Sequence, residues 1–135
     1  MVTSKIVYLG ELRCSSTHLQ SGTEILTDAP TDNHGKGEVF SPTDLCATSL
    51  AQCILTTIAI LGRNKNINIQ GATCELQKIM MTNPRRIGEI ICHFKFPTLH
   101  TEEEKKFIEE TAEKCPVAAS LHPDIKQTLT FTYGV

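Results

Sequence analysis

The segment that most constrains the fold is residues 41–62, which read "SPTDLCATSLAQCILTTIAILG". Ser41 suits the N-cap of a helix and Pro42 suits its first position, while the carboxylate of Asp44 complements the positive end of the helix dipole. Gly62 is a typical helix stop. Apolar side chains occupy nearly every face between these ends, which predicts a buried, central helix. They are Leu45, Ala47, Leu50, Ala51, Ile54, Leu55, Ile58 and Ile60.

The bulk properties are those of one globular domain, which we expect to span residues 1–135. A chain of 135 residues is long enough for a real core and short for two domains. Its net charge is −2 and its basic residues are scattered, so nucleic acid is not an expected partner. The apolar run 50–61 is too short to span a bilayer, and the N-terminus lacks the pattern of a signal peptide. We therefore expect a soluble, cytoplasmic protein with no membrane partner.

The remaining segments alternate between strand and helix patterns. Residues 5–9, 11–19 and 23–27 read as short strands, and the Gly-, Asn- and Pro-rich stretch 28–40 reads as a loop. After the central helix, residues 67–81 and 86–96 read as strands around a turn. A second helix starts at Thr101 with a capping box, a short helix follows in 115–121, and 127–135 is a final strand. This order predicts an α+β domain.

The six cysteines do not form a recognisable disulfide or metal pattern. The chain has no Cys-x-x-Cys and no close Cys/His cluster, so no metal cofactor is expected. Cys14, Cys74 and Cys92 fall on strand positions where a small core residue is the simplest interpretation. Cys46 and Cys53 share one helix, and a seven-residue spacing puts their Cα atoms about 10.5 Å apart, beyond the limit of about 7 Å for a disulfide.

Two residues have both a structural and a chemical interpretation. Cys115 precedes Pro116, and if a helix starts there, its positive end favours the reactive thiolate; a packing role for Cys115 stays open. Arg13 lies on a predicted strand. It is either an exposed strand residue or a guanidinium turned inward to hold a thiolate, balanced by a carboxylate such as Asp44.

Two motifs together resemble the OsmC/Ohr family, the osmotically inducible and organic hydroperoxide resistance proteins. They are "FSPTDLCATSLAQC" on the predicted central helix and "AEKCPVAASL", whose cysteine follows Cys53 by 62 residues. The resemblance extends in element order over essentially the whole chain. It implies an OsmC-like fold in which antiparallel sheets pack around a central buried helix, and an intertwined homodimer.

The resemblance also implies the roles of individual residues. Cys53 takes the position of the nucleophile and Cys115 that of the resolving cysteine, while Cys46 is assigned to packing. Arg13 resembles the arginine that lies beside the reactive thiolate, and Asp44 stands where the hydroperoxide-specific branch has a glutamate. The implied chemistry is reduction of an organic hydroperoxide by Cys53, disulfide formation with Cys115, and reduction by an external thiol or dithiol such as a lipoyl group.

Two functions from different classes are therefore expected. The first is a thiol-dependent peroxidase, which the pair Cys53 and Cys115 favours. The alternative is an OsmC-fold protein that binds a small molecule or senses redox state with little turnover, which the shorter acid at Asp44 and the additional Cys46 favour.

Overall fold

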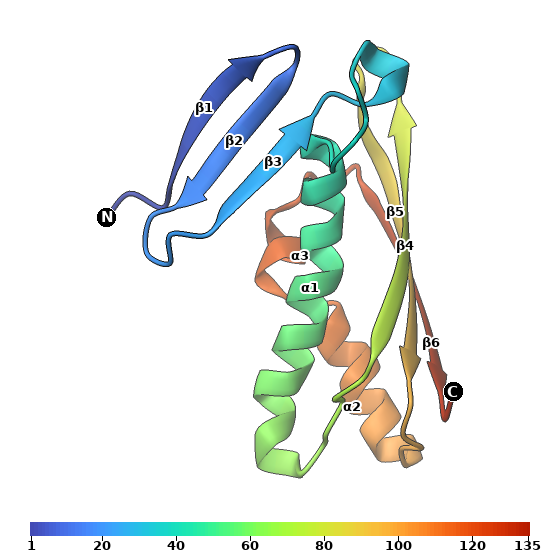
Figure 1. Ribbon diagram of the computed structural model, residues 1–135. Helices are drawn as coiled ribbons and strands as arrows, with labels where there is room; N and C mark the ends of the chain where they lie inside the picture. The colour runs from blue at the N-terminus through green and yellow to red at the C-terminus, as the bar shows by residue number, and fades with distance from the viewer. The chain divides into compact units, whose positions relative to one another are not determined.

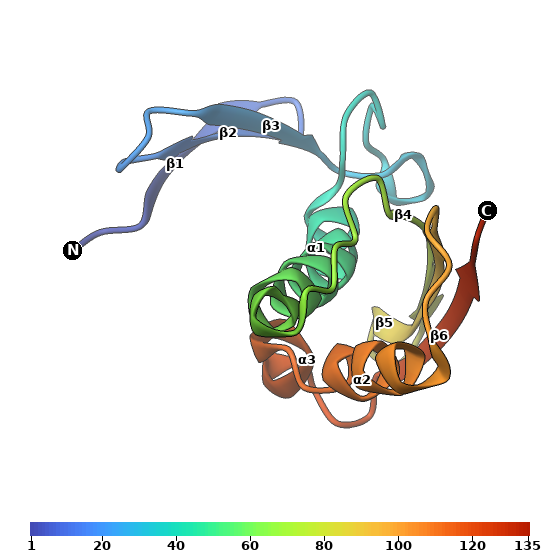
Figure 2. The same cartoon turned by 90° about the horizontal axis from the view of Figure 1, so that it is seen from below.

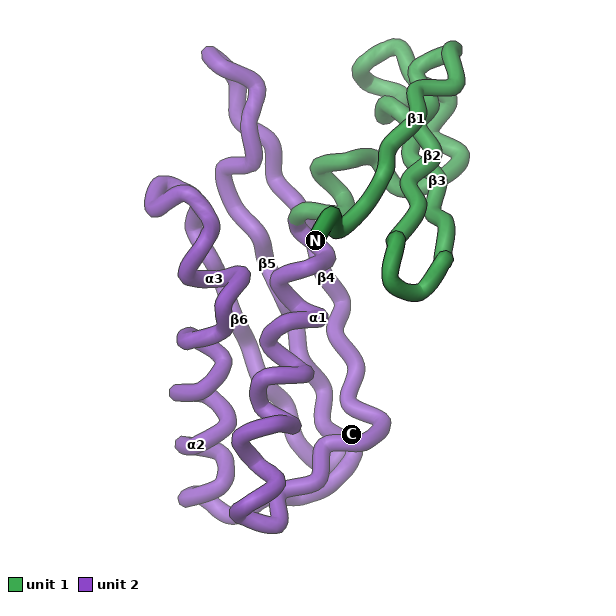
Figure 3. Tube along the Cα trace, turned by 90° about the vertical axis from the view of Figure 1, so that its left-hand side faces the viewer, with its two compact units in different colours: residues 1–46 green, residues 47–135 purple.

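A computed structural model describes all residues from 1 to 135. The chain forms two compact units, an N-terminal unit of Met1–Cys46 and a C-terminal unit of Ala47–Val135 (Figure 3). The boundary falls within the central helix α1, Pro42–Gly62. The expected element order, with strands, a helix, strands, helices and a strand, is confirmed (Figure 1).

The N-terminal unit is a three-stranded antiparallel sheet in the order β1-β2-β3. Its strands are β1, Ser4–Gly10, β2, Arg13–His18, and β3, Glu24–Asp28. The register places Arg13 directly opposite Asp28. After β3 the loop contains only a single 3-10 turn, η1, Thr31–Asn33, as its composition predicted.

Both faces of this sheet carry exposed apolar side chains. Side chains alternate between faces along a strand, so Ile6 and Tyr8 lie on one face of β1 while Val7 and Leu9 lie on the other. A sheet in a globular protein ordinarily buries at least one apolar face. The N-terminal unit alone has no layer that covers either of them.

The helix α1 begins and ends at the predicted residues. Its start is stabilised by side-chain caps, whereas a 3-10 turn follows its end. At the start, Ser41 Oγ accepts from the backbone N–H of Asp44, and Asp44 Oδ2 accepts from the N–H of Ser41, both at 3.0 Å. Beyond Gly62 the chain continues as a 3-10 turn, η2, Arg63–Lys65, and the left-handed cap is Asn66 (φ 55°). A Cβ on Gly62 would meet Ile67 Cβ at 3.2 Å, so close packing is what favours glycine there.

The prediction that α1 is buried on all sides is wrong for the single chain. Leu50, Ile54 and Ile58 are fully buried, whereas Ile60 and Leu61 are at least half exposed. By length and composition alone, Pro42–Lys65 would also suffice to cross a membrane, in contrast to our expectation from the shorter apolar run. The core helix of a globular protein meets the same criteria, so this observation carries little weight.

The second sheet belongs to the C-terminal unit and has the order β4-β5-β6. Strand β4, Thr73–Met81, pairs antiparallel with β5, Arg86–Phe96, and β6, Lys126–Tyr133, pairs with β5 in parallel. The expectation of purely antiparallel sheets is therefore wrong at this edge. The chain between β5 and β6 passes through two helices, and such a crossover brings the next strand back in the same direction.

These two helices are α2, Glu102–Ala112, and α3, Pro116–Ser120. The capping box predicted at Thr101 is present, with the Thr101 hydroxyl and the Glu104 carboxylate each accepting a backbone N–H. Figure 2 shows α1 and α2 on the same face of the β4–β6 sheet. The core lies between them and includes Phe94, Phe96 and Ile108 together with Cys92 and Cys115.

Candidate active site

The structure brings Cys53 and Cys115 together, although 62 residues separate them in the sequence. Cys53 lies near the middle of α1 and is half-buried, while Cys115 is the N-cap residue of α3 and is fully buried. Their thiols interact with one another, and no disulfide joins them. Both residues belong to the C-terminal unit.

The Cys-Pro sequence explains how α3 presents its first N–H groups to these sulfur atoms. Pro116 fixes the first helical position and has no N–H, so the first free donors belong to Val117 and Ala118. The N–H of Ala118 donates to Cys115 Sγ at 3.3 Å, and the N–H of Val117 interacts with both sulfurs. The side chain of Gln127 donates to the carbonyl of Ala118 at 3.3 Å and so fixes α3 to β6.

The environment shifts the pKa values of the two thiols in opposite directions. Partial burial raises the pKa of Cys53, but hydrogen bonds from the Val117 N–H and from the side chains of Cys115 and Thr57 outweigh it, and the net pKa is lowered. Burial raises the pKa of Cys115, and the neighbouring Cys53 raises it further against the N–H of Ala118. Cys53 is thus the more accessible and more acidic thiol, which is the arrangement expected of a nucleophile beside a second, protonated thiol.

Thr57 is a site residue that the sequence reasoning missed. It lies one helical turn after Cys53, and its hydroxyl is 3.8 Å from Cys53 Sγ. The spacing of four residues on a helix was available in the sequence and brings such side chains together.

Arg13 is half-buried and bound to two carboxylates in the N-terminal unit. Its Nε and Nη2 atoms donate to the two oxygens of Asp28 at 2.6 and 2.8 Å, and Nη2 also donates to Glu38 at 2.8 Å. Asp28 is buried and accepts a further bond from the N–H of Glu38 at 3.2 Å. The Arg13 guanidinium lowers the pKa of Asp28, although burial opposes this effect.

The carboxylates that hold Arg13 in the structure are those of Asp28 and Glu38, and the suggested balance of its charge by Asp44 stays a prediction. Asp44 accepts the N–H of Ser41 at the start of α1, where its short side chain suits a capping residue. Asp28 and Glu38 thus fix the side chain of Arg13, and Asp44 fixes the backbone of Ser41.

Comparison with known proteins gives the family. A model of the family described as OsmC-like protein matches residues 35–130. The chain belongs to the OsmC-like family. The match includes α1 with Cys53 and the Cys-Pro start of α3. A comparison with curated proteins gives no significant match.

Solved structures resemble this OsmC-like chain over nearly its whole length. An osmotic stress induced and detoxification response protein from Psychrobacter arcticus 273-4 is 51% identical, with a TM-score of 0.95, covering 98% of this chain and 96% of that one. An OsmC-like protein from Mycoplasma pneumoniae has 22% identity and a TM-score of 0.80, covering 96% and 94%. An organic hydroperoxide resistance protein from Legionella pneumophila has 15% identity and a TM-score of 0.77, covering 98% of both chains. The last two show the fold.

The remaining cysteines of this OsmC-like protein differ in burial. Cys92 is fully buried and confirms its predicted place in the core, whereas Cys14 and Cys74 are only half-buried. Cys46 is exposed, so the packing role assigned to it is wrong within the single chain. Seven residues are close to two helical turns, so Cys46 and Cys53 lie on the same face of α1. The core covers this face more at Cys53 than at Cys46.

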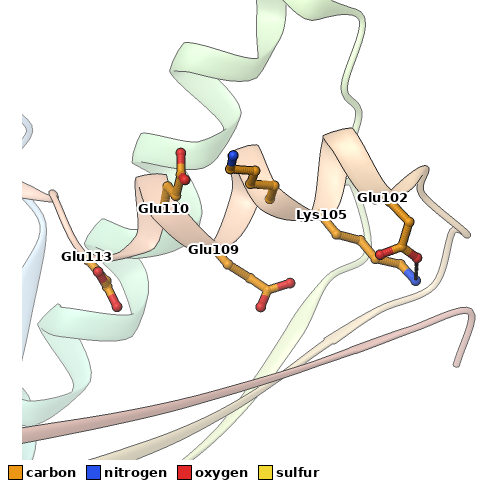
Figure 4. A pocket seen from close by; sticks show the side chains of 6 residues that line it. Glu102, Lys105, Glu109, Glu110 and Glu113 are labelled. Carbon is orange, nitrogen blue, oxygen red and sulfur yellow. Dashed lines mark hydrogen bonds and ion pairs between the residues drawn. The ribbon is translucent and has the colours of Figure 1, made fainter.

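A hollow on the surface of α2 lacks the side chains that a thiol reaction needs. It is lined by Glu and Lys side chains, of which Lys105 and Glu102 form an ion pair at 3.3 Å (Figure 4). None of the six cysteines lines it. The structure also has no group of three or more His, Cys, Asp or Glu side chains arranged to hold a metal ion.

Proposed function

We propose that this OsmC-like protein is a cysteine-based peroxidase that reduces organic hydroperoxides. The observation that carries the proposal is the contact between the accessible, more acidic thiol of Cys53 and the buried, less acidic thiol of Cys115. Relatives described as organic hydroperoxide resistance proteins share the fold and support the substrate class.

The proposed reaction has three steps. The Cys53 thiolate attacks the terminal oxygen of the hydroperoxide, the O–O bond breaks, and the alkoxide leaves as the alcohol after taking a proton; Cys53 becomes a sulfenic acid. The Cys115 sulfur then attacks Cys53 Sγ, loses its proton, and releases water as the disulfide forms. An external dithiol, such as a reduced lipoyl group, restores both thiols by exchange and is itself oxidised to a disulfide.

Arg13 and Asp44 have distinct parts in this proposal. Arg13 favours the thiolate and orients the peroxide through its positive charge, and Asp28 and Glu38 fix the guanidinium. Asp44 acts through the start of the helix that carries Cys53. No metal or organic cofactor takes part.

A peroxide titration followed by mass spectrometry tests the proposal. One equivalent of cumene hydroperoxide is expected to give a Cys53–Cys115 disulfide in the wild type and a Cys53 sulfenic acid in Cys115→Ser. Cys46→Ser is the matched control, because Cys46 lies on the same helix and on the same tryptic peptide as Cys53. Equal peroxide consumption by Cys53→Ser and wild type would contradict the assignment of the nucleophile.

One observation favours the alternative, a redox sensor with little turnover. The positive charge of Arg13 is already shared between two carboxylates, which leaves less of it for a thiolate or a peroxide. The two functions differ in steady state: with excess dihydrolipoamide, a peroxidase consumes many equivalents of hydroperoxide per chain, whereas a sensor stops at the first disulfide.

We propose further that the protein acts as a homodimer in the cytoplasm, where reducing conditions keep its thiols free. The exposed apolar side chains on both faces of the β1–β3 sheet and at the end of α1 support an apolar interface between two copies. Sedimentation equilibrium should give twice the monomer mass of 14.9 kDa, and a monomer at micromolar concentration would contradict this proposal.

A further inference from the structure

A second pair of thiols lies in the β4–β6 sheet of the C-terminal unit. In the antiparallel register, Cys74 is opposite Phe94 and Cys92 is opposite Leu76. Directly opposed residues point to the same face of a sheet, so Cys74 and Cys92 are diagonal neighbours on one face. Both are in contact with the core of the C-terminal unit.

The two thiols interact, and their environments differ in the same sense as those of the first pair. Cys92 is fully buried, while Cys74 is half-exposed and near the start of β4. The interaction with Cys92 lowers the pKa of Cys74 against partial burial, with help from the backbone of His93. The interaction with Cys74 and complete burial raise the pKa of Cys92.

We propose that Cys74 and Cys92 form a second redox-active dithiol that reacts with small-molecule disulfides by thiol–disulfide exchange, as a site separate from Cys53 and Cys115. The thiolate of Cys74 attacks one sulfur of a disulfide RSSR, forming a mixed disulfide and releasing RS⁻. The Cys92 sulfur then attacks Cys74 Sγ, gives up its proton, and releases the second RS⁻. One RSSR is reduced to two RSH, and one protein disulfide forms.

The spacing of the pair makes its disulfide easy to reverse. Diagonal neighbours in an antiparallel pair have Cα atoms about 7–8 Å apart, just beyond the usual limit of about 7 Å, so closing the bond requires a small shift of β4 against β5. A bond that has to hold the strands in this shifted position is strained, so an external dithiol reduces it readily and the site can cycle. Cys92 also interacts electrostatically with Cys115, which makes a Cys92–Cys115 bond the competing product.

The test uses the Cys53→Ser/Cys115→Ser variant, in which the first pair is absent and the peroxidase proposal plays no part. Serine is a good N-cap residue, so α3 should keep its start. The folded variant, checked by circular dichroism, is incubated with bis(2-hydroxyethyl) disulfide, quenched in acid and alkylated after denaturation. Trypsin places Cys74 on residues 66–78 and Cys92 on residues 87–95, so a bond between them links two peptides.

We expect the linked peptide in this variant and its complete loss after dithiothreitol. Adding Cys74→Ser should abolish the linked peptide and raise the alkylated fraction of Cys92 at least about 10-fold, because the intramolecular exchange step is then gone. Adding Cys46→Ser is the control and should change neither result. A Cys74 that stays reduced would overturn the proposal, as would a stable mixed disulfide at Cys74 beside a free Cys92. In otherwise wild-type protein, a Cys92–Cys115 bond in place of the Cys74–Cys92 bond would also overturn it.

Discussion

Replacement of Thr57 by valine tests whether the environment of α1 makes Cys53 acidic. Valine keeps the β-branched shape of threonine and removes the hydroxyl that lies 3.8 Å from Cys53 Sγ. Because a hydroxyl donor stabilises the thiolate more than the thiol, its removal should raise the pKa of Cys53.

The expected size follows from the geometry of this contact. A hydrogen bond in a protein has a net value of about 0.5–1.5 kcal/mol, and a sulfur–oxygen distance of 3.8 Å is long, so we take about 0.5–1 kcal/mol. One pKa unit corresponds to about 1.4 kcal/mol, which gives a rise of about 0.4–0.7 units. Below the pKa of Cys53, the thiolate fraction and the alkylation rate should therefore fall about 2.5- to 5-fold.

The assay is the pH dependence of iodoacetamide alkylation at Cys53, measured by mass spectrometry in a Cys46→Ser background. Thr56→Val is the matched control: it is the adjacent residue of α1, and its hydroxyl donates to the carbonyls of Gln52 and Cys53 rather than to the sulfur. The two profiles for Thr57→Val and wild type should converge above the pKa. An unchanged profile in Thr57→Val, or an equal shift in Thr56→Val, would refute this account of the acidity.

Three further predictions concern stability. The pKa of Asp28 is lowered in the folded protein, so the stabilising effect of its carboxylate is present above the unfolded pKa of about 3.9 and is lost as the pH falls through the folded value. Asp28→Asn should therefore lower the melting temperature at neutral pH and make the melting temperature depend less on pH in the acid range. Ser41→Ala removes the N-cap of α1 and should cost about 1 kcal/mol in urea unfolding, and a loss below experimental error would argue against the cap. Ile54→Ala empties a fully buried position and should cost about 2–5 kcal/mol, whereas the exposed Thr56→Val should stay within about 0.5 kcal/mol.

The sequence predicts the elements of this fold well because their signals are local. The cap formed by Ser41 and Asp44, the capping box at Thr101 and the proline after Cys115 each act within a few residues, and all three start a helix in the structure. The alternation in 86–96 likewise corresponds to strand β5. The family follows from two such local motifs at a specific separation.

Properties that depend on partners far along the chain were predicted less well. The parallel pairing of β6 depends on the path through α2 and α3, which no local pattern encodes. The interaction of Cys74 with Cys92 depends on the register of β4 against β5, and a shift by one residue would put the thiols on opposite faces. Apolar composition around α1 predicted burial, but composition alone does not say whether the same chain provides the covering surface.

The partner of Arg13 shows how a long-range contact could have been derived from the sequence. The turn at residues 19–23 fixes the register of the hairpin that β2 and β3 form, and this register places Asp28 directly opposite Arg13. Opposite charges at facing positions of an antiparallel pair attract one another. Asp44, in contrast, is three residues after an N-cap serine, where its carboxylate serves the backbone N–H of Ser41. Because helix capping and hairpin register each give one aspartate a local partner, both assignments follow without reference to a homologous position.

If the charge of Asp28, at its place opposite Arg13, holds the Arg13 guanidinium in position, then Asp28→Glu should preserve more stability than Asp28→Asn at neutral pH. Asp28→Glu retains the charge and lengthens the side chain. Equal melting temperatures for the two variants would show that packing around Asp28, and not its charge, holds Arg13 in place.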